Sequence, residues 1–420
     1  MRYDSGDTAW LLICTALVLF MTPGLAFFYG GMVRSKNVLT MLMQNVVCIA
    51  VVSVTWGAVG FSLAFGPDAG GGLVGTLRHV GLAHLDGAAN GTVAGFEGLT
   101  VPPLIFAAFQ CMFAVITAAL ITGAVADRVR FGGFVVFIAA WSVLVYPVLA
   151  HWVFSPGGWL FGRGLLDFAG GTVVEVNCGA AAVAAAVVVG RRRGWPREAM
   201  APHSLPLTLL GAGILWFGWF GFNAGSALHA DGLAASALVN THYAGVGGLL
   251  AWIGVERFRI GHATTLGAAS GAVAGLVAIT PSAGYLSAPA SFAVGLAAGA
   301  VCAFAVTLKY RVGVDDALDV FGVHLVGGVV GTLAIGLLAT GATNPAVGTK
   351  GLLLGGGAGQ LGKQALGIVV AMVFSFTATW LLATLVQRTI GLRVDPESEV
   401  NGLDSALHAE SAYDHAGGRF

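Results

Sequence analysis

Stretches of about 20 apolar residues recur along almost the whole of this 420-residue chain. Such a stretch crosses a lipid bilayer as an α-helix, because a helix satisfies its own backbone hydrogen bonds. The composition agrees, since 57% of the residues are hydrophobic and only 10% are charged. The apolar runs are continuous and do not alternate with polar residues, which argues against a transmembrane β-barrel. We therefore predict an all-α integral membrane protein.

Eleven candidate spans can be placed on the sequence. They cover residues 8–28, 38–65, 101–124, 131–154, 172–190, 205–222, 235–255, 264–281, 289–308, 321–339 and 364–386. The spans are rich in small residues, which let transmembrane helices approach one another closely. We expect residues 1–390 to form the membrane domain, and residues 391–420 to form a cytoplasmic, regulatory C-terminal tail.

The Lys and Arg residues predict the orientation. Eleven spans put the two termini on opposite sides of the membrane, and cytoplasmic loops carry an excess of basic residues. The loops on one side, together with the tail, hold 15 Lys and Arg residues, and the other side holds 5. We therefore expect the N-terminus outside, the C-terminus inside, and a multi-pass protein of the cell membrane.

Two pairs of ionisable residues share one spacing. Glu175 follows Asp167 by eight residues in the fifth span, and His324 follows Asp316 by eight residues in the tenth. Spans one to five and six to ten each contain five helices, and an odd number inverts the second half relative to the first. Inverted repeats of this kind place their site near the midplane of the membrane. We expect Glu175 and His324 to face each other there.

Ionisable groups inside a membrane are costly, so they are candidates for function. Glu175 and His324 could handle a proton or a small cation, or they could form a hydrogen-bonded pair that only joins two helices. Asp167 is best interpreted as an N-terminal helix cap, with a direct cation ligand as the alternative. The acidic tail has the composition of a disordered, solvated end, and that alternative stays open.

The sequence argues against several other functions. Five cysteines lie in apolar spans without a metal-binding spacing, so we interpret them as packing residues and expect no metal site. There is no phosphate-binding glycine loop, no nucleophile elbow and no basic patch for nucleic acid. We expect neither an enzyme nor a cofactor nor a nucleic-acid partner; the expected surroundings are the lipid bilayer.

Four long motifs carry a resemblance to a known family. They are Phe28-Tyr-Gly-Gly-Met-Val-Arg-Ser-Lys-Asn37, Asp167-Phe-Ala-Gly-Gly-Thr-Val-Val174, Gly218-Trp-Phe-Gly-Phe-Asn-Ala-Gly-Ser226 and Asp319-Val-Phe-Gly-Val-His324. They resemble the signatures of the ammonium transporter (Amt/Mep/Rh) family, on its Amt branch. Parts of the tail, such as Gly402-Leu-Asp404, resemble that branch as well. The resemblance runs from about Trp10 to Tyr413.

The resemblance implies a homotrimer with one narrow hydrophobic pore in each subunit. It also implies an outer ammonium site, a gate of two phenylalanines and two facing pore histidines. By their motifs, Phe113, Phe154 and Ser226 match the outer site, and Phe113 and Phe222 match the gate. Asp167 matches a supporting aspartate, and His324 matches the second pore histidine.

Two positions depart from the pattern of the family. Phe154 stands where the outer site usually has tryptophan, which is a stronger cation–π partner. Glu175 stands in place of the first pore histidine, an exchange that occurs in some fungal members.

The resemblance implies that ammonium binds at the outer site and is deprotonated. Ammonia then crosses the pore while Glu175 and His324 relay the proton. The alternatives are an ammonium sensor with the same fold and a channel for neutral gas. The ordered motifs of the tail also predict a PII-type regulatory protein at the cytoplasmic face.

Overall fold

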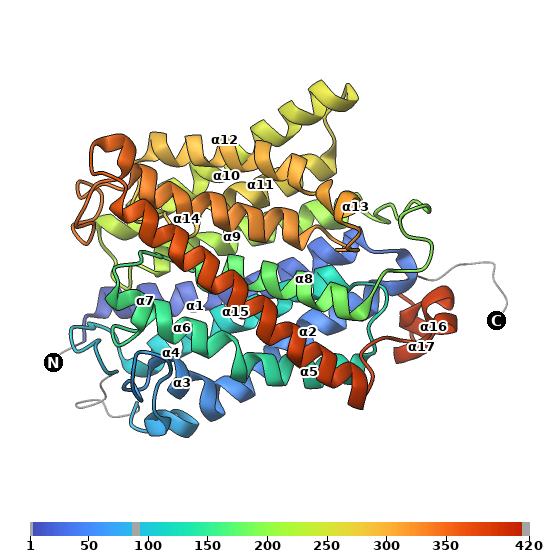
Figure 1. The fold of residues 1–420 in the computed structure, drawn as a ribbon, viewed down its shortest axis with the longest axis horizontal. Coiled ribbons are helices and arrows are strands. Elements are labelled where there is room, and N and C mark those ends of the chain that lie inside the picture. Colours follow the sequence, from blue (N-terminus) through green and yellow to red (C-terminus); the bar gives the residue numbers. More distant parts are fainter. Residues whose placement is uncertain (1–2, 86–92, 414–420) are drawn as a thin grey trace.

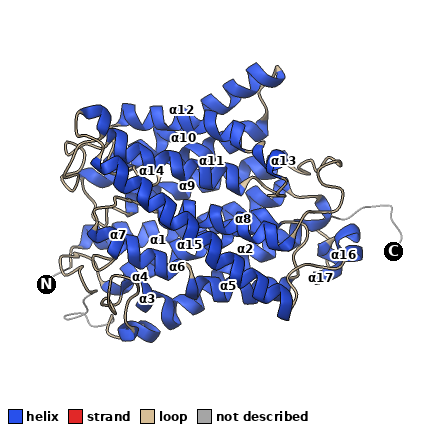
Figure 2. Cartoon of the chain, viewed as in Figure 1, coloured by secondary structure: helices blue, strands red, loops and turns tan. Residues whose placement is uncertain are grey.

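The computed structural model describes residues 3–85 and 93–413, and within these ranges the chain forms helices and no strand. Figure 2 shows the all-helical cartoon. The α-helices are α1 (Ser5–Met32), α2 (Val38–Thr55), α3 (Phe61–Phe65), α4 (Pro103–Ile121), α5 (Phe131–Leu144), α6 (Tyr146–Phe154), α7 (Trp159–Gly162), α8 (Asn177–Val189), α9 (Leu205–Gly225), α10 (Gly232–Ile260), α11 (Thr265–Ile279), α12 (Ala288–Ala305), α13 (Leu308–Val312), α14 (Val326–Leu338), α15 (Gly359–Thr389), α16 (Pro396–Asn401) and α17 (Leu403–His408).

Short helical turns of other kinds connect or begin several of these helices. Three are π-helical: η2 (Trp56–Gly60), η5 (Gly171–Val176) and η6 (Phe321–Leu325). Four are 3₁₀ turns: η1 (Ser35–Asn37), η3 (Leu77–Leu82), η4 (Thr122–Val125) and η7 (Leu352–Leu354). Because η5 runs directly into α8 and η6 into α14, each of these pairs forms one continuous span.

All eleven predicted spans fall on helices of the structure. In the described part of the chain, nine helical segments are long and apolar enough to cross a membrane. The other two predicted spans lie on α10, which is less apolar, and on α11, which has only 15 residues. The all-helical membrane fold is therefore confirmed, while the count of eleven stays a prediction.

The long helices run roughly side by side, with α15 crossing the others diagonally in Figure 1. Small residues allow the closest approaches. A Cβ atom on Gly211 of α9 would lie 2.2 Å from the Phe28 backbone nitrogen of α1. A Cβ atom on Gly275 of α11 would lie 2.1 Å from the Ala244 carbonyl oxygen of α10. Any larger residue at either position would push two helices apart.

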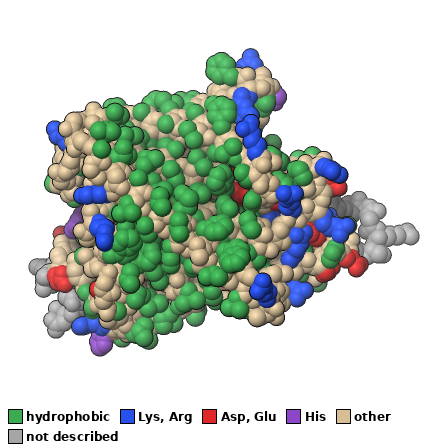
Figure 3. Space-filling model, in the orientation of Figure 1, with side chains coloured by type: hydrophobic (Ala, Val, Ile, Leu, Met, Phe, Trp, Pro, Cys, Tyr) green, Lys and Arg blue, Asp and Glu red, His purple; other side chains and the backbone are tan. Residues whose placement is uncertain are grey.

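The two ends of the bundle differ in charge. Helix α1 begins at one end, called here the N-terminal end, and α16 and α17 lie at the opposite, C-terminal end (Figure 1). Figure 3 shows Lys and Arg side chains mainly at the C-terminal end, beyond a broad band of hydrophobic side chains. Such a band flanked by charge is typical of a protein that lies in a bilayer.

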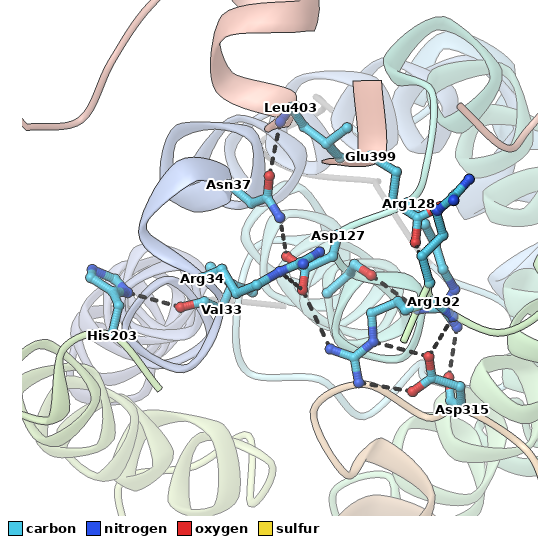
Figure 4. Close-up of polar contacts among 12 residues, drawn as sticks. Val33, Arg34, Asn37, Asp127, Arg128, Arg192, His203, Asp315, Glu399 and Leu403 are labelled. Carbon is cyan, nitrogen blue, oxygen red and sulfur yellow. Dashed lines mark hydrogen bonds and ion pairs between the residues drawn. The ribbon is translucent and has the colours of Figure 1, made fainter. Parts of the chain in front are cut away.

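Charged side chains are buried at the C-terminal end. Asp127 accepts hydrogen bonds from Asn37 and from Arg34, the latter at 3.2 Å. The Arg192 guanidinium contacts Asp127 at 3.4 Å and donates two hydrogen bonds to Asp315, at 2.9 and 2.8 Å (Figure 4). Burial raises the pKa of Asp315, but its bonds with Arg192 and the charge of Arg128 outweigh burial and hold that pKa below its usual value. These ion pairs join loops that are distant in sequence.

Residues 391–413 of the tail are folded onto this end. Asp404 accepts hydrogen bonds from Leu39 N at 3.0 Å and from Thr40 N and Oγ1, both at 2.8 Å. The Leu403 N–H donates to Asn37 Oδ1 at 2.8 Å (Figure 4). The alternative of a disordered tail is therefore wrong for these residues. Composition misled because a few specific hydrogen bonds, and no long apolar run, hold the tail.

We predict that Asp404→Ala releases the tail. The substitution removes three hydrogen bonds to a charged acceptor, each contributing about 1.5–3 kcal/mol. Limited proteolysis should then cleave residues 391–413 roughly ten times faster or more, because cleavage follows the population of the open state. Glu397→Ala is the matched control, since that side chain is exposed. Equal cleavage rates in the two variants would show that Asp404 does not hold the tail.

Candidate functional site

A cavity of about 370 Å³ lies toward the N-terminal end of the bundle. Its wall is mostly aromatic and apolar, with few polar side chains. It includes four of the residues singled out from the sequence: Phe113, Phe154, Asp167 and Ser226. The structure therefore brings these four together, although they come from four separate segments of the chain.

Phe154, and not Trp152, lines this cavity. The Trp152 indole donates a hydrogen bond to the Leu73 carbonyl at 2.7 Å and packs against Trp159 and Phe374. This bond turns Trp152 away from the cavity. Phe154, which the resemblance to the family matches to the usual tryptophan, therefore lies in the cavity wall.

Asp167 forms a helix cap beside the cavity. Its carboxylate accepts hydrogen bonds from the backbone N–H groups of residues 170–173, at 2.7–3.4 Å, and from the Thr172 hydroxyl at 2.5 Å. This arrangement satisfies the free N–H groups at the start of a helix. Asp167 therefore has the structural contacts that the sequence favoured for it.

Phe113 of α4 and Phe222 of α9 form a stacked pair. Their ring centroids lie 4.0 Å apart with an angle of 16° between the planes, and both side chains are buried. Phe113 lines the large cavity, whereas Phe222 lines a second, much smaller cavity deeper in the bundle. The two rings therefore lie between the two cavities.

The smaller cavity contains the Glu175 and His324 pair. Its volume is about 10 Å³, which is close to the least that holds one water molecule. Glu175 Oε2 lies 2.7 Å from His324 Nδ1, and these residues are only 1% and 3% exposed. The remaining wall is apolar, with side chains such as Leu25, Val174 and Val273. The structure thus places Glu175 and His324 against each other.

The equal spacing seen in the sequence has a structural counterpart. Asp167 Oδ2 accepts from the N–H of Thr172, five residues later, at 2.7 Å. Asp316 Oδ2 accepts from the N–H of Phe321, also five residues later and also at 2.7 Å. Each bond stands at the start of a π-helical turn, η5 or η6, and these turns carry Glu175 and His324. Burial raises the pKa of Asp316 to about 6.

Sequence reasoning missed two side chains at the site. Cys178 Sγ, a Glu175 carboxylate oxygen and a His324 ring nitrogen all lie within 4.8 Å of one another, a donor set that can hold a metal such as zinc. The available signal was the spacing of Cys178, one helical turn after Glu175. Gln110 lines the large cavity one helical turn before Phe113. A glutamine in an apolar span did not by itself indicate a site residue.

These features define a multi-pass membrane protein with a candidate site buried between its helices. The model of the Ammonium Transporter Family matches residues 9–413, so the chain belongs to this family and is a multi-pass protein of the plasma membrane.

The chain is also similar to individual members of the family. It is 51% identical to an ammonium transporter of Mycobacterium tuberculosis over 438 residues, covering 98% of this chain and 91% of the relative. The Mep2 structure from Candida albicans shares 35% identity with a TM-score of 0.87, covering 94% of this chain and 88% of that one. A structure titled "Sensor Amt Protein" shares 30% identity with a TM-score of 0.86, covering 96% of this chain and 98% of that one.

Proposed function

We propose that this protein transports ammonium across the membrane. Ammonium binds in the large cavity and is deprotonated, and ammonia passes the phenylalanine pair into the small cavity. Glu175 and His324, which takes the role of second pore histidine, relay the proton. The observation that carries the proposal is the stacked phenylalanine pair between an open aromatic cavity and a buried carboxylate–imidazole pair. The name of the Mycobacterium tuberculosis relative, "Ammonium transporter", supports it.

Deprotonation follows from the cost of moving an ion through this pathway. Placing an ammonium-sized ion in an apolar interior costs several kcal/mol even after relaxation. Beyond Phe222 there is room for about one water-sized molecule, which is too little for a hydrated ion. Neutral ammonia avoids this cost. The proton then needs a separate carrier, and Glu175 with His324 at 2.7 Å offers one.

The large cavity is the proposed outer site. The faces of Phe113 and Phe154 attract the cation by about 0.5–2 kcal/mol per ring, and the Ser226 oxygen accepts one of its N–H groups. Asp167 acts through its negative charge, because its oxygens already accept five hydrogen bonds. Since phenylalanine is a weaker partner than tryptophan, Phe154 makes recruitment weaker than in members with tryptophan.

For the topology, we propose eleven spans with the N-terminus outside and the C-terminus inside. Spans one to five and six to ten form inverted repeats. Support comes from the basic side chains gathered at the C-terminal end (Figure 3). Further support comes from the matching aspartate bonds to Thr172 and Phe321 at the start of η5 and η6.

The second candidate function is an ammonium sensor. The likeness to the structure titled "Sensor Amt Protein", with a TM-score of 0.86, favours it. A transporter moves ammonium, and net charge if the proton crosses too, whereas a neutral-gas channel moves no charge and a pure sensor carries little flux. Current from protein reconstituted on supported membranes, measured on an ammonium pulse, separates a transporter from the other two functions, and flux into proteoliposomes separates a neutral-gas channel from a sensor.

Glu175 is expected to decide charge movement and selectivity. Glu175→Gln keeps the size of the side chain and removes the acid, so most of the ammonium-evoked current should be lost. Glu175→His should keep transport and improve discrimination against potassium, because a neutral imidazole holds a bare cation less well than a carboxylate. Currents are normalised to folded protein, and Glu97→Gln on the exposed surface is the control. If Glu175→Gln keeps the wild-type current and selectivity, Glu175 is only a packing residue and the proposed relay is wrong.

Phe222 should be more important than Phe113 for preventing leaks. Phe222 lines the small cavity directly, so Phe222→Ala joins it to the larger one. We expect a potassium leak in proteoliposomes, together with a loss of stability of about 3–5 kcal/mol. The matched control is Phe217→Ala, which removes a ring on the exposed face of the same helix. A folded Phe222→Ala protein with unchanged ion selectivity would rule out a gating role.

We further propose a homotrimer that binds a PII-type regulatory protein at the cytoplasmic face. The folded tail supports the second part, because it offers an ordered surface at the basic end of the bundle (Figure 3). Native mass spectrometry of the detergent-solubilised protein should give three chains. A pull-down with PII, with and without nucleotide effectors, should lose binding when residues 397–420 are deleted. Undiminished binding would exclude the tail from this interface.

A further inference from the structure

Gln110 places a carboxamide at the wall of the large cavity. It lies on α4, one helical turn before Phe113, and lines the cavity together with Phe154 and Ser226. Its Oε1 atom is buried, and within the described part of the chain no group donates a hydrogen bond to it. Buried polar atoms usually have a partner, because leaving one unpaired costs free energy. The oxygen has almost no accessible surface in the structure, so it meets a donor from the cavity when the carboxamide turns.

Asp167 and Ser226, two other polar residues of the cavity wall, already make hydrogen bonds within the protein. Both oxygens of Asp167 accept hydrogen bonds from the helix start. The Ser226 hydroxyl donates to the Phe222 carbonyl at 2.9 Å, which leaves its oxygen free to accept. Ammonium carries four N–H donors and no acceptor, so the hydroxyls of Ser226 and Tyr285, which also lines the cavity, leave part of it unmatched.

We propose that Gln110 Oε1 accepts a hydrogen bond from ammonium in this cavity. The inference rests on the proposed function and adds a binding residue to it. The terminal torsion of a glutamine side chain is broad, so the carboxamide can turn its oxygen toward the ion. The phenylalanine faces supply attraction to the charge, while Gln110 and Ser226 supply acceptors that a primary amine or ammonium requires.

The proposal predicts which substrates are affected. Methylammonium replaces one N–H of ammonium by a methyl group, so it needs one acceptor fewer. Gln110→Met keeps the length of the side chain, removes the acceptor and offers an apolar contact to the methyl group. The loss should therefore be larger for ammonium than for methylammonium.

The experiment measures concentration dependence in proteoliposomes. For Gln110→Met, we expect the half-saturating ammonium concentration to rise about tenfold with a similar maximal rate, because a hydrogen bond to a charged group is lost. The preference for ammonium over methylammonium should fall by a similar factor. Leu104→Met on the exposed side of the same helix is the matched control. Gln110→Asn, which keeps an acceptor on a shorter side chain, should lie between the wild type and Gln110→Met.

A second measurement is independent of transport. Binding of ammonium raises the Tm of the solubilised wild-type protein, and Gln110→Met should need about ten times more ammonium for the same rise. Unchanged half-saturation and unchanged Tm shifts in Gln110→Met would overturn the proposal, as would a loss of maximal rate alone. If the wild type binds ammonium but carries no flux, the transporter function fails while the Tm series still decides the role of Gln110.

Discussion

The contact between Glu175 and His324 depends on how the two π-helical turns η5 and η6 meet. The residues are 149 positions apart, yet their side chains approach to 2.7 Å. Each of the two residues follows an aspartate by eight positions, and that aspartate accepts a hydrogen bond at the start of the residue's π-helical turn. A buried ionisable group is tolerated only when it is paired, so a shift of one turn relative to the other would be costly. The two aspartate caps therefore set the register of the pair.

Much of this architecture is visible in the sequence, because it depends on length and spacing. Apolar runs of spanning length predict the helices, and the equal offsets from Asp167 and Asp316 predict the facing pair. The aromatic residues could not be sorted in the same way. Spans buried on most sides have no polar face, so helical periodicity does not show which ring points inward. Only the resemblance to the family selected Phe113, Phe154 and Phe222, whereas Gln110 and Cys178 required the three-dimensional arrangement.

At the C-terminal end of the bundle, amino-acid composition does not predict the structure. Charged residues between apolar spans look like solvated loops, yet Asp127, Arg192 and Asp315 are buried in one connected network. Burial of charge is tolerated because each carboxylate meets a guanidinium group, and breaking one partner would leave the other unpaired. The tail docks beside this network through Asp404. Pairing between distant loops leaves no local signal, so neither the network nor the folded tail could be predicted from residue types.

In the large cavity, the negative charge of Asp167 is kept out of direct contact with a bound ion. This arrangement suits the proposed outer site, which must release its ion. Asp167 is surrounded by N–H donors from the helix start, which stabilise its charge and occupy its oxygens. Its field still attracts a cation, since charges act over distance where little water screens them. In the proposed outer site, the groups that contact the ion are neutral: aromatic faces, a hydroxyl and a carboxamide. A carboxylate in direct contact would hold the ion more tightly, but transport requires binding that is weak enough for the ion to move on. Phenylalanine is a weaker cation–π partner than tryptophan, so under the proposed function Phe154 favours rapid release over tight capture.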